Sequence, residues 1–259
     1  MAAPRHVLVT GASSGIGAAL ARHYAESGVT LSLLARNVER MEGVAAQCRN
    51  SGAEVISERV DVCDGRAMSL AVESCDARLA IDLVIANAGL GGERALAGAA
   101  GESLSDAHDM IETNVTGVAN TVIPLLPHFL ARRRGQIAII SSLAAFVPLA
   151  DSPVYAASKA AVRVYGHGLR RLLLPGGVAV TVVCPGFVAT PMSESLGRRR
   201  PFLWSTERAA RYIADGLARN RREISFPWQL AIPARLAGNL PFWLSDPLFH
   251  RTRRNGGMP

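Results

Sequence analysis

The sequence predicts an α/β fold in which a mostly parallel, seven-stranded sheet is doubly wound, with helices on both faces in a three-layer arrangement. Two observations carry this prediction. Short apolar runs rich in β-branched residues alternate with longer stretches of helical periodicity. Several of these apolar runs are each followed directly by a glycine or a polar residue. Of the 259 residues, 49% are hydrophobic, which is enough for one large core, and we expect residues 1–259 to form a single domain.

The first expected unit is a strand at His6–Val9, a glycine-rich turn at Thr10–Gly17 and a helix at Ile16–Ser27. Glycines let a backbone approach a pyrophosphate closely, and the free N–H groups of a helix N-terminus bind phosphate. A strand, a glycine-rich turn and a helix in this order therefore predict a dinucleotide site. The residues of the turn expected to form it are Gly11, Ser13, Ser14, Gly15, Ile16 and Gly17.

The second strand, expected at Val29–Ala35, ends in Arg36. Dinucleotide enzymes that use NAD place an acidic residue at this strand end, where it binds the 2′-hydroxyl of the ribose. Arg36 suits a 2′-phosphate instead, although a solvated arginine would give the same sequence. This strand end therefore favours NADP(H) as the cofactor, with NAD(H) as the alternative.

The remaining elements continue the alternation. Pro124 and Pro127 are expected to bend or divide the longest helical stretch. Further helices are expected at 38–52, 64–77, 106–134, 155–174 and 206–219, further strands at 55–60, 81–86, 136–142, 178–183 and 223–226, and loops at 96–101 and 143–154.

Five expected strands end in a glycine or a polar residue. Because the carboxyl ends of parallel strands meet at one edge of a sheet, we expect these residues to surround one ligand site. They are Gly11, Arg36, Asp61, Asn87 and Ser142.

Tyr155 and Lys159 are four residues apart, so a helix places them on one face. A phenol beside an ammonium group is a proton donor with an adjustable pKa. Lys159 is the only lysine of the chain, and all other basic residues except the histidines are arginine. Since arginine cannot lose its proton, a site that needs lysine chemistry explains this position better than chance. Ser142 ends the preceding strand and can supply a hydroxyl group to the same point.

The C-terminal quarter differs from the rest in composition. Residues 198–259 hold 12 of the 28 basic residues, 4 of the 21 acidic residues and all three tryptophans. We expect residues 191–226 to contain a lid, a helix and the last strand, and residues 227–259 to form a basic extension with proline and tryptophan. Such a surface can lie on a membrane and admit a lipid-like substrate. A role of this segment in completing the substrate pocket and forming a subunit contact explains the composition better than membrane binding does.

Composition excludes several classes of function. No run of about eighteen apolar residues predicts a transmembrane helix, and no apolar secretory segment precedes the strand at His6. The four cysteines form no CxxC pair and fit no zinc spacing, so we expect reduced thiols, no metal and a cytoplasmic protein. The arginines do not gather in a recognised nucleic-acid-binding module, so nucleic acid is not an expected partner.

In order and at these spacings, the motifs resemble the short-chain dehydrogenase/reductase family, whose fold is Rossmann-like. The resemblance covers residues 6–191 motif by motif and the sheet pattern to about residue 226. The family spacing of thirteen residues before the tyrosine selects Ser142 over Ser141. The catalytic residues that the resemblance implies are Asn114, Ser142, Tyr155 and Lys159. The cofactor contacts that it implies beyond the glycine-rich turn and Arg36 are Asp61, Val62, Asn87, Ala88, Gly89, Tyr155, Lys159, Pro185, Gly186, Val188 and Thr190.

The resemblance implies a carbonyl/alcohol oxidoreductase. Tyr155 would donate a proton to the substrate oxygen, and Ser142 would hydrogen-bond that oxygen. Lys159 would hold the nicotinamide ribose and, together with the oxidised nicotinamide, lower the pKa of the phenol. Asn114 would hold a water that connects the lysine with solvent. Family members are commonly dimers or tetramers, which implies a homo-oligomer.

Two alternatives stay open. Arginine at the second strand end goes with NADP in this family, but Ser14 stands where a basic residue is often found, so the NADP prediction rests on Arg36. The competing function is an NADP(H)-binding regulatory or scaffold protein without turnover. The presence of both Tyr155 and Lys159 favours the enzyme.

Overall fold

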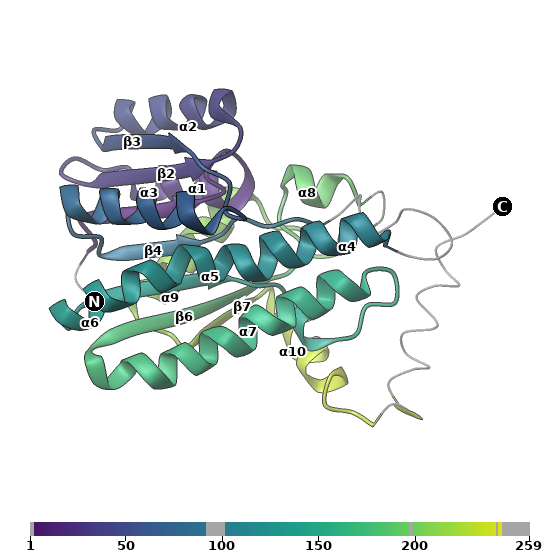
Figure 1. Ribbon diagram of the computed structural model, residues 1–259. Helices are drawn as coiled ribbons and strands as arrows, with labels where there is room; N and C mark the ends of the chain where they lie inside the picture. Colours follow the sequence, from purple (N-terminus) through teal and green to yellow (C-terminus); the bar gives the residue numbers. More distant parts are fainter. Residues whose placement is uncertain (1–2, 92–101, 197–198, 242, 245–259) are drawn as a thin grey trace.

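The computed structural model describes residues 3–91, 102–196, 199–241 and 243–244 (Figure 1). Its centre is one sheet of seven strands in the order β3-β2-β1-β4-β5-β6-β7, and every pairing in it is parallel. The predicted fold class is therefore confirmed. The strands are β1 His6–Thr10, β2 Thr30–Ala35, β3 Glu54–Arg59, β4 Leu83–Ala86, β5 Gly135–Ile140, β6 Val178–Pro185 and β7 Glu223–Phe226.

Helices cover both faces of the sheet (Figure 1). One face packs against α1 (Gly15–Tyr24), α2 (Val38–Asn50) and α9 (Thr206–Ala218). The other face packs against α3 (Gly65–Arg78), the helical stretch from 104 to 132 and α7 (Pro153–Leu173). Two apolar layers therefore enclose the strands, as the sequence pattern predicts for a doubly wound sheet.

The inner strands are buried along their whole length, while both edges are partly open. Every residue of β1, β2, β5 and β6 is buried, whereas β3 has no fully buried residue. Within β1, Leu8 packs into one apolar layer and Val7 and Val9 pack into the other. Burial on both faces explains why these strands read as continuous apolar runs rather than as alternating ones.

The helical stretch predicted at 106–134 is divided, as its prolines indicated. Pro124 lies in a 3₁₀ turn at Ile123–Leu125, where a ring without an N–H ends the regular pattern. A π-turn at Glu112–Thr116, which the sequence did not predict, holds Asn114. The α-helical parts are α4 Leu104–Ile111, α5 Gly117–Val122 and α6 Leu126–Arg132.

Three other segments differ from the expectations. The loop predicted at 143–154 begins with a 3₁₀ turn at Leu143–Phe146, and α7 begins at Pro153 because proline is well placed in the first turn of a helix. The lid segment contains a short helix, α8 at Pro191–Glu194. The C-terminal extension contains α10 at Trp228–Ala237. The loop predicted at 96–101 lies outside the described residues.

No helix in the described part of the chain is long and apolar enough to cross a membrane.

Candidate active site

A cavity of about 590 Å³ opens at the carboxyl ends of the strands. The sheet order reverses between β1 and β4, and a reversal of this kind leaves a crevice where ligands bind in doubly wound sheets. The cavity size is typical of a site for a small molecule or cofactor. Of the residues that the sequence predicted for the site, all line this cavity except Gly17 and Asn114.

The glycine-rich turn after β1 depends on its missing side chains. Gly11 and Gly15 have φ angles of +65° and +56°, a region that glycine adopts without steric cost. A Cβ atom on Gly17 would lie 2.4 Å from Nδ2 of Asn87 and 2.6 Å from the carbonyl oxygen of Gly11. The sequence therefore keeps glycine here because the turn, α1 and the end of β4 are packed together.

Asn87 fastens the end of β4 to this turn. Its Nδ2 donates to the carbonyl oxygens of Thr10 at 3.0 Å and Gly11 at 3.3 Å. The Thr10 hydroxyl oxygen in turn accepts from the backbone N–H groups of Asn87 at 3.1 Å and Ala88 at 3.3 Å. The asparagine that the sequence placed beside the cofactor thus also fixes the shape of the turn.

The N-terminus of α1 suits a phosphate group. Its N-cap residue, Ser14, makes no side-chain hydrogen bond to the helix, and the first turn carries no acidic residue. Ser14, Gly15 and Ile16 line the cavity. Backbone N–H groups of such a turn, together with the helix dipole, favour an anion. The residues present therefore fit the pyrophosphate of a dinucleotide.

Arg36 and Asp61 lie beside each other at the ends of β2 and β3. Arg36 Nη1 is 3.5 Å from Asp61 Oδ2, and the two side chains are 60% and 43% exposed. Burial raises the pKa of Asp61, but the backbone N–H of Cys63 and the guanidinium of Arg36 outweigh it and lower the pKa. An exposed pair of this kind contributes little to stability, so its charges are available to a ligand.

Tyr155 lies in the first turn of α7, and Tyr155 and Ser142 line the same cavity. Burial raises the pKa of its phenol, and the nearby Ser142 side chain partly opposes that rise. Lys159 is not among the groups that shift the pKa of the Tyr155 phenol. The Nζ of Lys159 lies 5.8 Å from the centre of the Tyr155 ring. With its pKa raised, the phenol is protonated at neutral pH.

Lys159 is 4% exposed, and its Nζ donates to the carbonyl oxygen of Ile140 at 3.3 Å. Burial lowers its pKa from 10.5 to about 8, with a smaller opposing effect from Cys184. A Cβ atom on Gly89 would lie 3.1 Å from this Nζ. The glycine of the Asn-Ala-Gly motif thus leaves room for the lysine at the cavity wall.

The two adjacent serines have different surroundings. The hydroxyl of Ser141 donates to the carbonyl oxygen of Lys159 at 2.7 Å, in the buried part of the helix contact. Ser142 caps the 3₁₀ turn, where its hydroxyl oxygen accepts from the backbone N–H of Ala144 at 3.1 Å. Both serines line the cavity, and the hydroxyl of Ser141 is already engaged by the backbone of α7.

Asn114 is fully buried. Its Oδ1 accepts from the backbone N–H of Leu90 at 2.7 Å, and its Nδ2 donates to the Leu90 carbonyl at 3.0 Å and to Ser158 at 3.0 Å. It therefore ties the segment after β4 to α7. A Cβ atom on Gly89 would lie 3.1 Å from both Asn114 Oδ1 and Lys159 Nζ, so the asparagine lies beside the lysine without lining the cavity.

The sequence did not predict one residue that contacts the start of α7, Glu102. Glu102 accepts hydrogen bonds from the backbone N–H groups of Val154 at 2.8 Å and Tyr155 at 3.1 Å. A carboxylate at a helix N-terminus satisfies free N–H groups and interacts favourably with the helix dipole. The sequence gives no local signal for this contact, because Glu102 is far from α7 along the chain.

The part of the cavity beyond Tyr155 is mostly apolar. Among the described residues that line the whole cavity, the charged side chains are Arg36, Asp61 and Lys159. The first two belong to the strand ends of the cofactor half. The apolar residues lining the other half include Leu90, Leu143, Ala144, Val147, Leu149, Phe187, Met192, Leu196, Leu230 and Ala234, and Ser152 and Ser193 line it with them. No group of histidine, cysteine and acidic residues able to hold a metal ion occurs in the described ranges.

Comparisons with known proteins agree with this geometry. A family model described as short chain dehydrogenase matches residues 5–201. An uncharacterized oxidoreductase of Myxococcus xanthus is 37% identical over 250 residues, covering 96% of this chain and 98% of that protein. The 11-beta-hydroxysteroid dehydrogenase-like 2 of Arabidopsis thaliana is 32% identical over 235 residues, covering 85% of this chain and 73% of that protein. A crystal structure of an actinorhodin polyketide ketoreductase variant with NADPH superposes with a TM-score of 0.79 at 26% identity, covering 88% of this chain and 97% of that chain.

Proposed function

The chain belongs to the short-chain dehydrogenase family, and on that premise we propose that it is an NADP(H)-dependent oxidoreductase interconverting an apolar ketone and its secondary alcohol. One observation carries the proposal. Ser142, Tyr155 and Lys159 line the same cavity as the glycine-rich turn and the strand ends that suit a dinucleotide. A regulatory protein that only bound the cofactor would have no need of this catalytic set.

Each residue has a role that its surroundings support. When bound, the nicotinamide cofactor supplies or accepts the hydride. Tyr155 donates its proton to the substrate oxygen as negative charge develops there, because its raised pKa keeps the phenol protonated. Ser142 hydrogen-bonds the same oxygen, a contribution on the order of 2.7–4 kcal/mol for such donors. Lys159 holds the nicotinamide ribose, and Asn114, hydrogen-bonded to Leu90 and Ser158, holds the segment after β4 and the water that connects the lysine with solvent.

Other residues of the cavity would hold the cofactor. The turn from Gly11 to Gly17 would take the pyrophosphate, and Asp61 and Val62 the adenine. The segment after β6 would take the carboxamide. Its proposed contacts are Pro185, Gly186, Val188 and Thr190, all of which line the cavity. The NADPH in the crystal structure of the ketoreductase variant supports a phosphorylated dinucleotide.

We expect Arg36→Ala to raise the KM for NADPH about 10–100-fold, as loss of one or two charge-assisted hydrogen bonds to a phosphate would do. The KM for NADH should stay unchanged, because NADH has no 2′-phosphate. Steady-state kinetics with both cofactors measures the two effects. Arg49→Ala, which removes an arginine near the other end of α2, is the control. An equal rise for both cofactors would show that Arg36 does not read the phosphate.

The function itself is tested by a screen of ketones, 3-oxoacyl compounds and secondary alcohols with NADPH and NADH in parallel. We expect NADPH oxidation with apolar ketones and slower turnover of charged ones, because the described lining of the substrate half carries no acidic or arginine side chain. Absorbance of the reduced nicotinamide follows the reaction. Tight NADPH binding without turnover of any compound would favour a regulatory or scaffold protein instead.

We also propose that the protein is a homo-oligomer of the cytoplasm. Exposed apolar side chains on α4 and α7, such as Leu104 at 87%, Ile111 at 40% and Val164 at 68%, are consistent with a homodimer or homotetramer formed through these helices. All four cysteines are free, as expected in the reducing cytoplasm.

A further inference from the structure

Helix α10 forms a wall of the cavity and lies beyond the matched residues 5–201. Leu230 and Ala234 line the cavity from this helix. On its other side, Trp228, Ile232 and Leu236 are 67%, 50% and 64% exposed. Because only one side of a short helix packs against the protein, tertiary contacts on that side must hold it in place.

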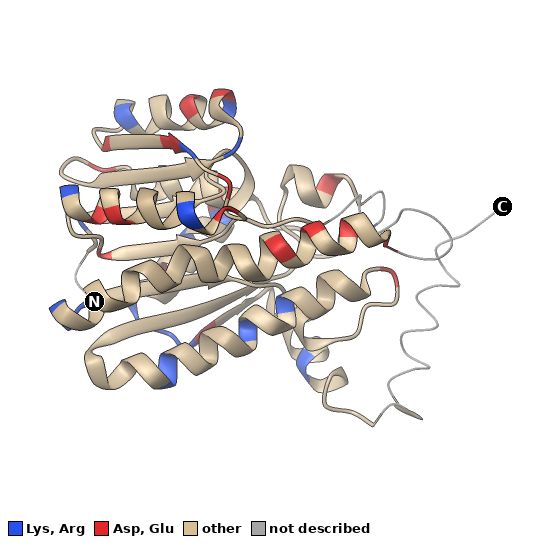
Figure 2. Cartoon of the chain, viewed as in Figure 1, with Lys and Arg blue, Asp and Glu red and all other residues tan. Residues whose placement is uncertain are grey.

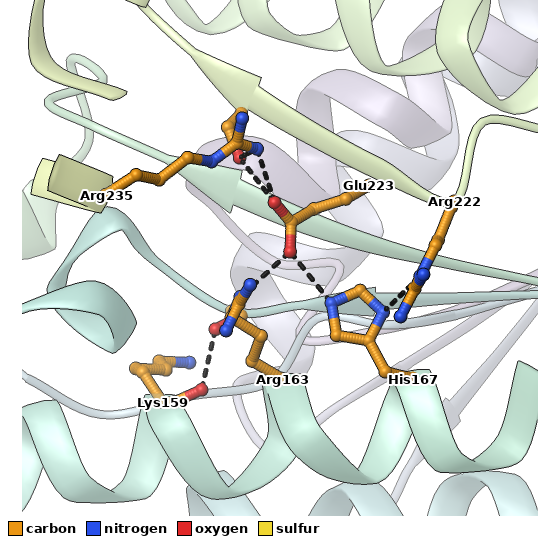
Figure 3. A network of polar contacts seen from close by, with 8 residues as sticks. Lys159, Arg163, His167, Arg222, Glu223 and Arg235 are labelled. Carbon is orange, nitrogen blue, oxygen red and sulfur yellow. Dashed lines mark hydrogen bonds and ion pairs between the residues drawn. The ribbon is translucent and has the colours of Figure 1, made fainter. Parts of the chain in front are cut away.

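A buried carboxylate at the start of β7 supplies such a contact (Figure 3). Glu223 is 12% exposed in its side chain, and its Oε2 accepts from Arg163 Nε at 2.8 Å and from His167 Nε2 at 2.8 Å. Its Oε1 accepts from Arg235 of α10, which also donates to Ser225 at 3.0 Å. We call Glu223, Arg163, His167 and Arg235 the Glu223 cluster.

The ionisation of Glu223 and the tautomer of His167 both fit the hydrogen bonds of the Glu223 cluster. Burial raises the pKa of Glu223, but His167 and Arg163 outweigh it and lower the pKa, so the carboxylate is ionised. Burial lowers the pKa of His167. Arg222 Nε donates to His167 Nδ1 at 3.4 Å, which leaves the ring proton on Nε2, facing Glu223.

The Glu223 cluster joins α10 to the catalytic helix. Tyr155, Lys159, Arg163 and His167 follow one another at intervals of four residues, so one face of α7 carries the catalytic pair and, further along, the partners of Glu223. Helices α7 and α10 carry basic residues and no acidic ones (Figure 2). The carboxylate of Glu223 therefore links two helices that would otherwise repel each other.

The same network reaches the turn that begins at Ser142. The guanidinium of Arg163 lies 4.2 Å from the centre of the Phe146 ring, and that of Arg235 lies 5.3 Å from it. Phe146 ends the 3₁₀ turn that Ser142 caps. Cation–π contacts from both helices thus fix the third element that surrounds the substrate half.

We propose that the Glu223 cluster is a positioning device that holds α10 as the wall recognising the apolar part of the substrate. The inference rests on the proposed function. Leu230 and Ala234 then determine how well a long or bulky apolar group fits. Glu223 and Arg235 act through the helix and touch neither substrate nor cofactor.

Arg235→Gln and Glu223→Gln test the proposal with methyl octyl ketone and methyl ethyl ketone as paired probes. We expect the KM for the long ketone to rise about tenfold, as lost apolar pocket contacts would cause. The KM for the short ketone, the KM for NADPH and the kcat for the short ketone should stay unchanged. Hydrogen exchange of residues 228–237 should become faster, while exchange in the first half of α7 should not.

Arg211→Gln on α9, outside the Glu223 cluster, is the matched control and should change none of these quantities. An equal rise of KM for both ketones, or unchanged hydrogen exchange in α10, would overturn the proposal. Arg235 is 45% exposed in its side chain, so its variant is expected to fold even if Glu223→Gln does not. If the unmodified protein reduces neither ketone, the proposed function fails for this substrate class, and hydrogen exchange alone decides whether the Glu223 cluster holds α10.

Discussion

Replacement of Tyr155 by phenylalanine is expected to lower kcat for ketone reduction by about 10²–10⁴-fold, the usual contribution of a positioned general acid. The variant keeps the ring and loses only the phenolic hydroxyl, which lies in the cavity that Ser142 also lines. Binding of NADPH should remain close to that of the unmodified protein, because the glycine-rich turn and Arg36 are untouched. Single-turnover kinetics and a fluorescence titration of NADPH measure the two quantities separately.

Tyr165→Phe is a matched control for this prediction. Tyr165 lies on the same helix, and among the described residues its buried hydroxyl has no hydrogen-bond partner. Removing an unsatisfied buried hydroxyl costs no hydrogen bond and relieves a desolvation penalty. The control should therefore fold normally and turn over at the unmodified rate. Retained turnover in Tyr155→Phe would show that another group supplies the proton.

Replacement of Lys159 by methionine is expected to abolish efficient turnover and to stabilise the cofactor-free protein at neutral pH. Burial lowers the pKa of Lys159 from 10.5 to about 8. At 1.36 kcal/mol per pKa unit, keeping the ammonium buried costs on the order of 3 kcal/mol of folding free energy. Methionine has a similar length and no charge to desolvate. Part of the gain is offset because the hydrogen bond to Ile140 is lost.

The stability gained by Lys159→Met is expected to decrease as the pH rises. Below about pH 8 Lys159 is charged in both the folded and unfolded states, so the full penalty applies. Between about pH 8 and 10.5 the unfolded state binds a proton that the folded state has lost, so the contribution of Lys159 to the free energy of unfolding rises with pH. The advantage of the methionine variant should therefore shrink over this range.

Denaturant unfolding at neutral pH and near pH 9.5 measures the difference between the two proteins. Both proteins contain the same buried cysteines, whose pKa values burial raises. The contribution of these thiols to the pH dependence of stability therefore cancels in the comparison. Arg171→Met, an exposed change on the same helix, should shift stability by less than about 0.5 kcal/mol. A methionine variant that is less stable at neutral pH, or whose advantage does not shrink, would contradict the assigned burial penalty.

The strands and helices could be predicted because each strand is marked by a short apolar run within its own residues. The last strand, Glu223–Phe226, lies where the sequence placed it. The strand ends came together because parallel topology requires it. The π-turn that holds Asn114 could not be predicted, because the partners of Asn114, Leu90 and Ser158, lie 24 and 44 residues away along the chain.

Contacts between distant elements account for what the sequence did not reveal. Glu102 meets α7 from 52 residues away, and Glu223 meets Arg163 from 60 residues away. The raised pKa of Tyr155 has the same origin. Spacing on a helix predicted the neighbouring charge of Lys159, but the burial that raises the pKa comes from the surrounding fold.

The hydrogen bonds between Asn87 and the glycine-rich turn have a consequence for the thermodynamics of binding. A turn held by strand β4 loses little conformational entropy when the pyrophosphate arrives, so most of the interaction free energy appears as affinity. A dinucleotide would therefore meet a preorganised surface at the carboxyl ends of β1 and β4.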